Sequence, residues 1–207
     1  MKGKFIVLDG CDFTGKSTQI QKIASYLRSR NIKHITTREP GGTQIGEQIR
    51  AVVLENGKQL HSSTELLLFM ASRSEHIYSK IIPMLEQGIS IICDRFLASS
   101  FVYQGILRGA SSSVIFNLHR EIFNNLQPDT MFILDMQPEQ ILERMQEVAF
   151  RGCNSYDSTK LEEIVKIRNG FLAFAKTQQC KVIDANQEQE EVFEHMLDSI
   201  NIIFNIS

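Results

Sequence analysis

Short apolar runs alternate with amphipathic stretches along the chain, and this alternation predicts the order of its elements. Helical patterns, among them 16–30 and the stretches that begin at Gly46 and Ser63, separate the apolar runs. Parallel strands need crossovers, and right-handed crossovers put helices on both faces of the sheet. We therefore expect an α/β fold, a doubly wound five-stranded parallel sheet flanked by helices, with ligands at the carboxyl ends of its strands. The predicted strands are Phe5–Leu8, His34–Thr37, Ile89–Cys93, Met131–Leu134 and Lys181–Ile183.

Composition and charge narrow the class of protein. The 207 residues are 43% hydrophobic and 22% charged, which suits a single domain over residues 1–207. The formal net charge of -2 gives no basic surface for a nucleic-acid polymer. No apolar run reaches the length of a membrane span, and MKGKFIVLDG has the pattern of a first strand. We expect a cytoplasmic protein that binds neither a membrane nor a nucleic-acid polymer.

Residues 10–17, GCDFTGKS, match the GxxxxGKS/T phosphate-loop motif and lie between an apolar run and a helical pattern, as that motif requires. Glycines let backbone N–H groups converge on a phosphate, and the helix N-terminus adds positive potential. Lys16 is expected on the β- and γ-phosphates, and the Ser17 hydroxyl on Mg²⁺. The residues predicted to bind ATP are Gly10, Cys11, Asp12, Phe13, Thr14, Gly15, Lys16, Ser17 and Thr18.

Cysteines and histidines carry no predicted site. The four cysteines lack CxxC spacing, so neither zinc nor a disulfide framework is indicated, and the five histidines form no pair at ligand spacing. Cys11 lies inside the phosphate loop, next to a helix N-terminus that can activate a thiol. We interpret it instead as a small residue at a variable position of the loop.

A phosphate loop alone leaves a kinase, a GTPase and a regulatory ATPase open, although the guanine-reading NKxD sequence is absent. The third predicted strand ends in IICDRF, which places Asp94 and Arg95 beside the phosphate loop. A loose phosphoryl transition state needs positive charge, so Arg95 is a candidate to bridge the donor and acceptor phosphates. Asp94 is a candidate to hold a metal-bound water or to orient Arg95. A surface ion pair at the strand end is the plain alternative.

Six segments, in order, resemble the thymidylate kinase family over nearly the whole chain. They are LDGCDFTGKST, TREPGGT at 37–43, LLLFMASRSEH at 66–76, DRFLASSFVYQG at 94–105, LD at 134–135 and VIDAN at 182–186. The resemblance implies a P-loop kinase fold, transfer of the γ-phosphate of ATP to dTMP with Mg²⁺, and a homodimer. Two alternatives stay open: another nucleoside monophosphate or deoxynucleoside kinase on this scaffold, and a P-loop binding module or switch without a small acceptor.

The same resemblance implies residues for the thymine base and the sugar. Phe69 would stack on thymine and Arg73 would hydrogen-bond a thymine carbonyl, and their spacing of four puts both on one helix face. Ordinary helix core is the alternative for Phe69. Tyr103 would crowd a 2'-hydroxyl and Gln104 would lie near the base. Two serines belong to the same predicted wall, Ser99 and Ser100.

Cations and one acid are implied for the dTMP phosphate and the sugar. Arg50 and Arg95 would grip the phosphate, because a doubly charged monophosphate needs that much positive charge, and Arg38 is a lesser candidate. A solvated helix face is the alternative for Arg50. Asp12 would address the 3'-hydroxyl and help to order the metal. The predicted catalytic residues are Lys16, Arg95, Arg151 and Asp12, and the predicted metal residues are Ser17 and Asp94.

The chain departs from the family pattern in the predicted short lid, approximately residues 144–157. Eukaryotic-type enzymes carry an arginine where this chain has Phe13, so the bacterial arrangement, with arginines in the lid, is implied. The acid-arginine-aromatic-acid run of that lid aligns with NSYD at 154–157, where Ser155 replaces the arginine. Arg151 is the nearest remaining cation and the first candidate for the lid arginine. Arg144 is the second.

Overall fold

Five parallel strands form a single sheet in the computed structural model, which describes residues 2–150 and 161–206. The strands are β1 (Phe5–Gly10), β2 (His34–Arg38), β3 (Ser90–Asp94), β4 (Thr130–Asp135) and β5 (Lys181–Asp184). Their order is β2-β3-β1-β4-β5, and every pairing is parallel. The predicted doubly wound α/β fold is confirmed, with strand bounds close to those expected from the apolar runs.

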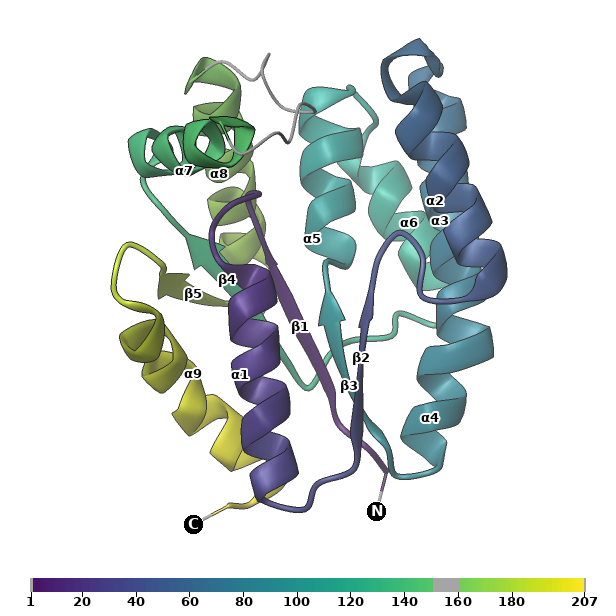
Figure 1. Ribbon diagram of the computed structural model, residues 1–207. Coiled ribbons are helices and arrows are strands. Elements are labelled where there is room, and N and C mark those ends of the chain that lie inside the picture. The colour runs from purple at the N-terminus through teal and green to yellow at the C-terminus, as the bar shows by residue number, and fades with distance from the viewer. Residues whose placement is uncertain (1, 151–160, 207) are drawn as a thin grey trace.

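Helices cover both faces of this sheet, as Figure 1 shows. On one face, α1 (Lys16–Ser29) packs on β1, β2 and β3, and α9 (Gln189–Phe204) packs on β4 and β5. The other face carries α4 (Ile82–Glu86), α5 (Leu97–Ser100) and α8 (Leu161–Thr177). Helices α2 (Gln44–Asn56) and α3 (Ser62–His76) pack side by side, and in Figure 1 α5 lies between this pair and α1. The remaining helical segments are η1 (Gly57–Gln59), η2 (Ile77–Ile81), η3 (Phe101–Leu107), α6 (Ser112–Ile122) and α7 (Pro138–Phe150).

The strand order brings two functional segments together. β1 is the central strand, and residues 5–8 are buried on both sides because helices cover both faces. Leu8 of β1 lies opposite Asp94 of β3, and Gly10 lies opposite Leu134 of β4. The phosphate loop after β1 and the Asp94-Arg95 turn after β3 therefore emerge beside each other at one edge of the sheet. Both chain ends lie at the opposite edge (Figure 1).

A helix that spans a membrane needs about 20 consecutive, mostly apolar residues. Within residues 2–150 and 161–206, no helix is long and apolar enough to cross a bilayer.

Candidate active site

The phosphate loop wraps around the ammonium group of Lys16. Gly10 has φ 133°, and a Cβ there would lie 2.6 Å from the carbonyl oxygen of Leu134, so the position requires glycine. Lys16 is buried, and its Nζ donates to the carbonyl oxygens of Gly10 at 3.1 Å and Cys11 at 2.6 Å. Burial, together with the nearby charge of Arg95, lowers the pKa of Lys16. The loop thus holds a cation where phosphates would bind.

Cys11 has the environment of a structural residue. Its side chain is buried, and its carbonyl oxygen accepts a hydrogen bond from the Thr14 hydroxyl at 2.9 Å. Burial raises the pKa of the Cys11 thiol to about 12. A thiol with that pKa is not ionised near neutral pH, so the cysteine fills space in the loop.

Asp9, to which sequence reasoning gave no role, joins the phosphate loop to the Arg95 segment. Its Oδ1 accepts hydrogen bonds from the Gly10 N–H at 3.0 Å and the Ser99 hydroxyl at 2.7 Å. Its Oδ2 accepts from the backbone N–H groups of Phe96 and Ser99, both at 3.0 Å. Burial raises the pKa of Asp9, against the opposing effect of Arg95. The available signal was an acid in the apolar run FIVLDG, because a buried acid needs partners.

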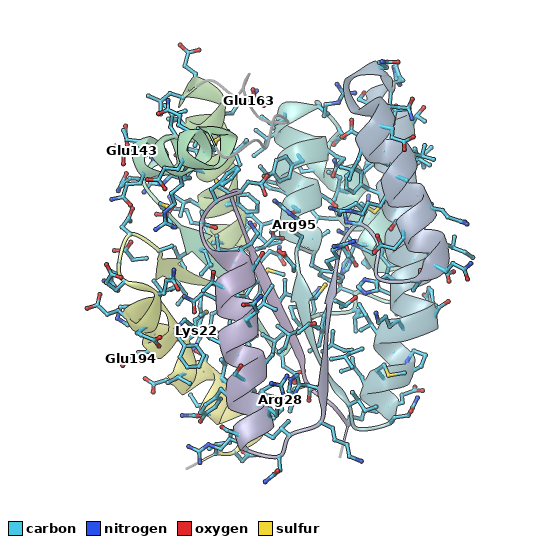
Figure 2. The ribbon with its side chains drawn as sticks, in the orientation of Figure 1. Lys22, Arg28, Arg95, Glu143, Glu163 and Glu194 are labelled. Carbon is cyan, nitrogen blue, oxygen red and sulfur yellow. The ribbon has the colours of Figure 1, made fainter. Side chains whose placement is uncertain are left out.

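Arg95 lies between the phosphate loop and the helices that follow β3. It has a positive φ of 69°, and its side chain lies near the middle of the molecule in Figure 2. Nη1 donates to the Ser99 hydroxyl at 2.9 Å, Nη2 donates to the Asp12 carboxylate, and the guanidinium lies 5.2 Å from the Tyr103 ring centroid. Burial alone would raise the pKa of Asp12, but Arg95 and Lys16 outweigh it and hold that pKa below its usual value. One guanidinium therefore contacts groups from both predicted substrate sites.

A cavity of about 230 Å³ adjoins Arg95 and collects most of the residues predicted to bind dTMP. Arg38 is outside it: this exposed side chain forms an ion pair with Glu47 at 3.0 Å and lines a separate groove with Ser17 and Asp94. The other nine candidates all line the cavity, so the structure brings together side chains from four segments of the chain. They are Asp12, Arg50, Phe69, Arg73, Arg95, Ser99, Ser100, Tyr103 and Gln104.

Phe69 and Arg73 reach this cavity from the same face of α3. Phe69 is half-buried and lies outside the buried core, which does not fit the helix-core alternative. Arg73 is buried; its Nε donates to Glu39 Oε2 at 2.7 Å and its Nη2 donates to the Ser100 hydroxyl at 2.9 Å. Arg50 Nη1 donates to the carbonyl oxygen of Pro40 at 3.0 Å. Several of the cavity's polar groups are therefore positioned by protein contacts.

Glu39 and His76 are two further buried residues that the sequence reading missed. Glu39 Oε1 lies 3.0 Å from His76 Nδ1, and His76 Nε2 lies 2.7 Å from the Thr37 hydroxyl. Burial would raise the pKa of Glu39, but the Arg73 charge and the His76 hydrogen bond hold it below its usual value. The histidine follows Arg73 by three residues, a spacing that puts both on one helix face and was the available signal.

Ser17 and Asp94 line the same groove beside the phosphate loop. Asp94 Oδ1 is buried and accepts no hydrogen bond from any residue that the structure describes. A hydroxyl and a free carboxylate oxygen are ligands that suit Mg²⁺, which commonly takes its other ligands from water and substrate phosphates. Within the described ranges, no group of three or more His, Cys, Asp or Glu residues forms a metal cluster. These two residues therefore fit a magnesium ion bound mainly through a nucleotide.

The structure places one of the two lid candidates. Arg144, on α7, donates from Nη1 to the carbonyl oxygen of Phe13 at 3.2 Å, so it touches the phosphate loop. Arg151 and the rest of the predicted lid after residue 150 lie outside the described residues.

A parallel sheet with a glycine phosphate loop, a buried lysine at that loop and a cation-lined acceptor cavity beside it together define a P-loop nucleotide kinase. Comparison with known proteins agrees with this class. The family model described as thymidylate kinase matches residues 8–196. The chain belongs to the thymidylate kinase family.

Curated relatives extend the similarity over nearly the full chain. It is 41% identical to a thymidylate kinase of Caldicellulosiruptor saccharolyticus, with 94% of each chain covered. It is 39% identical to one of Dichelobacter nodosus over 98% of this chain and 100% of the relative. A thymidylate kinase of Carboxydothermus hydrogenoformans is 38% identical, with 93% of this chain and 94% of the relative covered.

Proposed function

We propose that this protein transfers the γ-phosphate of ATP to dTMP, giving ADP and dTDP. The main observation is that Asp12 of the phosphate loop and Arg95, which follows β3, both line the acceptor cavity and are joined by a hydrogen bond. Two substrates bound on either side of that pair would place their phosphates next to each other. The family match and the names of the curated relatives support dTMP as the acceptor.

Positioning and positive charge do most of the work in phosphoryl transfer. The loop N–H groups and Lys16 would hold the donor phosphates. Arg95 would contact the migrating phosphoryl group and the acceptor phosphate together, which favours charge that develops between them. Arg50, which also lines the cavity, would neutralise the acceptor phosphate, with Arg38 outside the cavity as the lesser candidate.

Ser17 and Asp94 would hold Mg²⁺, which when bound neutralises charge on the donor phosphates. The half-buried Phe69 ring would stack on the base, and Arg73 would donate to a base carbonyl. Asp12 and Tyr103 would lie along the sugar, and Ser99 and Ser100 along the remaining wall.

An acceptor panel tests this function. Coupled ADP release is measured with ATP and Mg²⁺ while dTMP, dUMP, dCMP and thymidine are offered in parallel. dTMP is expected to give the highest kcat/KM. Preference for another monophosphate would favour the related kinase reading, and no ADP with any acceptor would favour a binding module or switch.

A homodimer is part of the proposal. Helices α2, α3, η2 and α6 carry exposed apolar side chains, among them Val52, Leu67, Tyr78, Val114 and Ile122. Leu67 and Tyr78 are eleven residues apart, a spacing that places them on one stripe of the α3-η2 helix. A cytoplasmic location and a single domain over residues 1–207 stay predictions.

A further inference from the structure

A buried carboxylate lies behind the acceptor cavity and contacts one of its lining residues. Glu65, on α3, is buried, and its Oε1 accepts a hydrogen bond from Gln104 Nε2 at 2.9 Å. Gln104 is buried as well and lines the cavity from η3. The other oxygen of Glu65 forms an ion pair with Arg108, with Nε and Oε2 2.8 Å apart. Glu65 and Arg108 do not line the cavity themselves.

The chemistry of this contact fixes which end of the Gln104 amide faces the cavity. An ionised carboxylate only accepts hydrogen bonds, whereas an amide donates through nitrogen and accepts through oxygen. Gln104 must therefore turn its NH₂ group to Glu65, which leaves the carbonyl oxygen Oε1 for the cavity. Within residues 2–150 and 161–206, the Gln104 amide makes its side-chain hydrogen bond through Nε2, and no side chain donates to Oε1. The cavity wall thus presents an acceptor.

Arg73 presents a donor to the same cavity. Its Nε donates to Glu39 and its Nη2 donates to Ser100, whereas among the described residues Nη1 makes only a weak contact with the sulfur of Met70 at 4.0 Å. An acceptor and a donor in one cavity complement a pyrimidine whose edge carries an N3–H next to a carbonyl at position 4. Cytosine inverts both groups: N3 accepts and the exocyclic amine donates. It would face Gln104 Oε1 with an acceptor and Arg73 with a donor.

We infer that Glu65 is a positioning residue that makes the cavity select thymine and uracil over cytosine, by holding the Gln104 amide with its oxygen toward the base. The inference rests on the proposed function for the identity of the acceptor. It makes Glu65, which does not line the cavity, responsible for the discrimination against cytosine.

The test replaces Glu65 by glutamine, which has the same shape but both donates and accepts. In Glu65→Gln the Gln104 amide can turn over, because either end now finds a partner. Affinities for dUMP and dCMP are measured by calorimetry without ATP, since these two ligands differ only at the N3 and position 4 edge. The wild-type protein is expected to prefer dUMP, and Glu65→Gln is expected to reduce that preference at least ~10-fold.

Arg108→Met is the matched control. It removes the same ion pair but keeps the carboxylate that orders Gln104, so the preference is expected to stay within ~2-fold of wild type while thermal stability falls. A double-mutant cycle adds Gln104→Met. If Glu65 acts through Gln104, Glu65→Gln has no further effect on the preference in the Gln104→Met background.

Should Glu65→Gln fail to fold, Glu65→Met combined with Arg108→Met removes both charges, so that neither is left without its partner. The dUMP preference must fall there too. An unchanged preference in the Glu65 variants, an equal loss in Arg108→Met, or a wild-type protein that binds dCMP as well as dUMP would overturn the inference. Because binding is read without ATP, these outcomes are independent of the ADP release that tests the proposed function.

Discussion

At the scale of single residues, the site depends on two cations with different environments. Lys16 donates to two backbone carbonyl oxygens, and burial together with the nearby charge of Arg95 lowers its pKa. Arg95 has carboxylates of Asp12 and Asp9 nearby, and together with Tyr103 they outweigh burial and raise its pKa. A bound phosphate would therefore stabilise the charge of Lys16 more than that of Arg95. Protein contacts already hold Arg95 in position without substrate.

Replacing Lys16 tests that distinction. Lys16→Ala is expected to lower kcat by roughly 10²–10³-fold, because a cation whose hold strengthens as charge develops is lost. Lys22→Ala is the control: Lys22 is on the same helix, lower in Figure 2, and its exposed ion pair with Glu190 contributes little. Steady-state ADP release measures kcat for both variants. A Lys16→Ala enzyme within about tenfold of wild type would contradict the catalytic role.

Tyr103 provides a second residue-scale prediction, on sugar discrimination. Its ring packs between the Arg95 guanidinium and Phe171, whose ring centroid lies 6.1 Å away, so its position is fixed. Tyr103→Ala should open space beside the sugar and narrow the preference for dTMP over its ribonucleotide, whereas Tyr103→Phe should keep it. The ratio of kcat/KM values for the two sugars is the measurement. A ratio that stays constant in Tyr103→Ala would place the discrimination elsewhere.

At the scale of elements, the loop after β2 is fastened to α3 by buried polar contacts. Glu39 binds Arg73 and His76, and the Gly41 N–H donates to the Ser72 hydroxyl at 3.0 Å. Such contacts join a loop and a helix that are more than thirty residues apart in sequence. Removing one partner from a buried pair leaves the other charge uncompensated, which costs about 3–5 kcal/mol.

Glu39→Gln should therefore destabilise the protein at neutral pH, and the loss should depend on pH. The folded pKa of Glu39 is held below the ordinary value of 4.5, so the unfolded chain binds the proton more readily. Its stabilising effect is present above pH 4.5 and disappears as the pH falls through the folded pKa. Denaturant unfolding across this range measures it. The difference in the free energy of unfolding between wild type and Glu39→Gln should become smaller in acid. A difference that stays constant with pH would mean that ionised Glu39 is not what stabilises the loop.

Sequence patterns predicted the elements of this fold well, for a physical reason. Strands covered on both faces read as continuous apolar runs, such as FIVL and SIIC, and the phosphate loop has a local signature. Asp9, Glu39 and Glu65 were not found, because the side chains and loops that they bind are 34 to 90 residues away in sequence. Hydrophobic periodicity indicates which residues are buried, but it does not indicate which distant group binds a buried acid.

At the scale of the whole molecule, the proposed homodimer can be tested with exposed apolar residues on helices that lie far apart. Leu67 of α3 is 61% exposed, among the exposed apolar residues of α2, α3, η2 and α6. Leu67→Glu is expected to shift a homodimer toward monomer by placing charge in its interface. Ile202→Glu is the control, since Ile202 is 71% exposed but belongs to α9, across the sheet in Figure 1. Sedimentation at several protein concentrations measures the oligomeric state of both variants. The same oligomeric state for both would contradict an interface at α3.

Closure over both substrates concerns the whole molecule as well, because the phosphate loop carries Phe13 in place of an arginine. Some cation must still reach the γ-phosphate. Arg151 is the predicted candidate, whereas Arg144 already donates to the Phe13 carbonyl oxygen at 3.2 Å. Arg151→Ala is expected to lower kcat at least ~100-fold, about 2.7 kcal/mol of transition-state stabilisation, with KM for dTMP nearly unchanged. Ser155→Arg in that background should restore part of the rate. Near-normal kcat in Arg151→Ala beside a crippled Arg144→Ala would assign the role to Arg144, whose hydrogen bond would then have to break so that the guanidinium can turn from the loop to the phosphate.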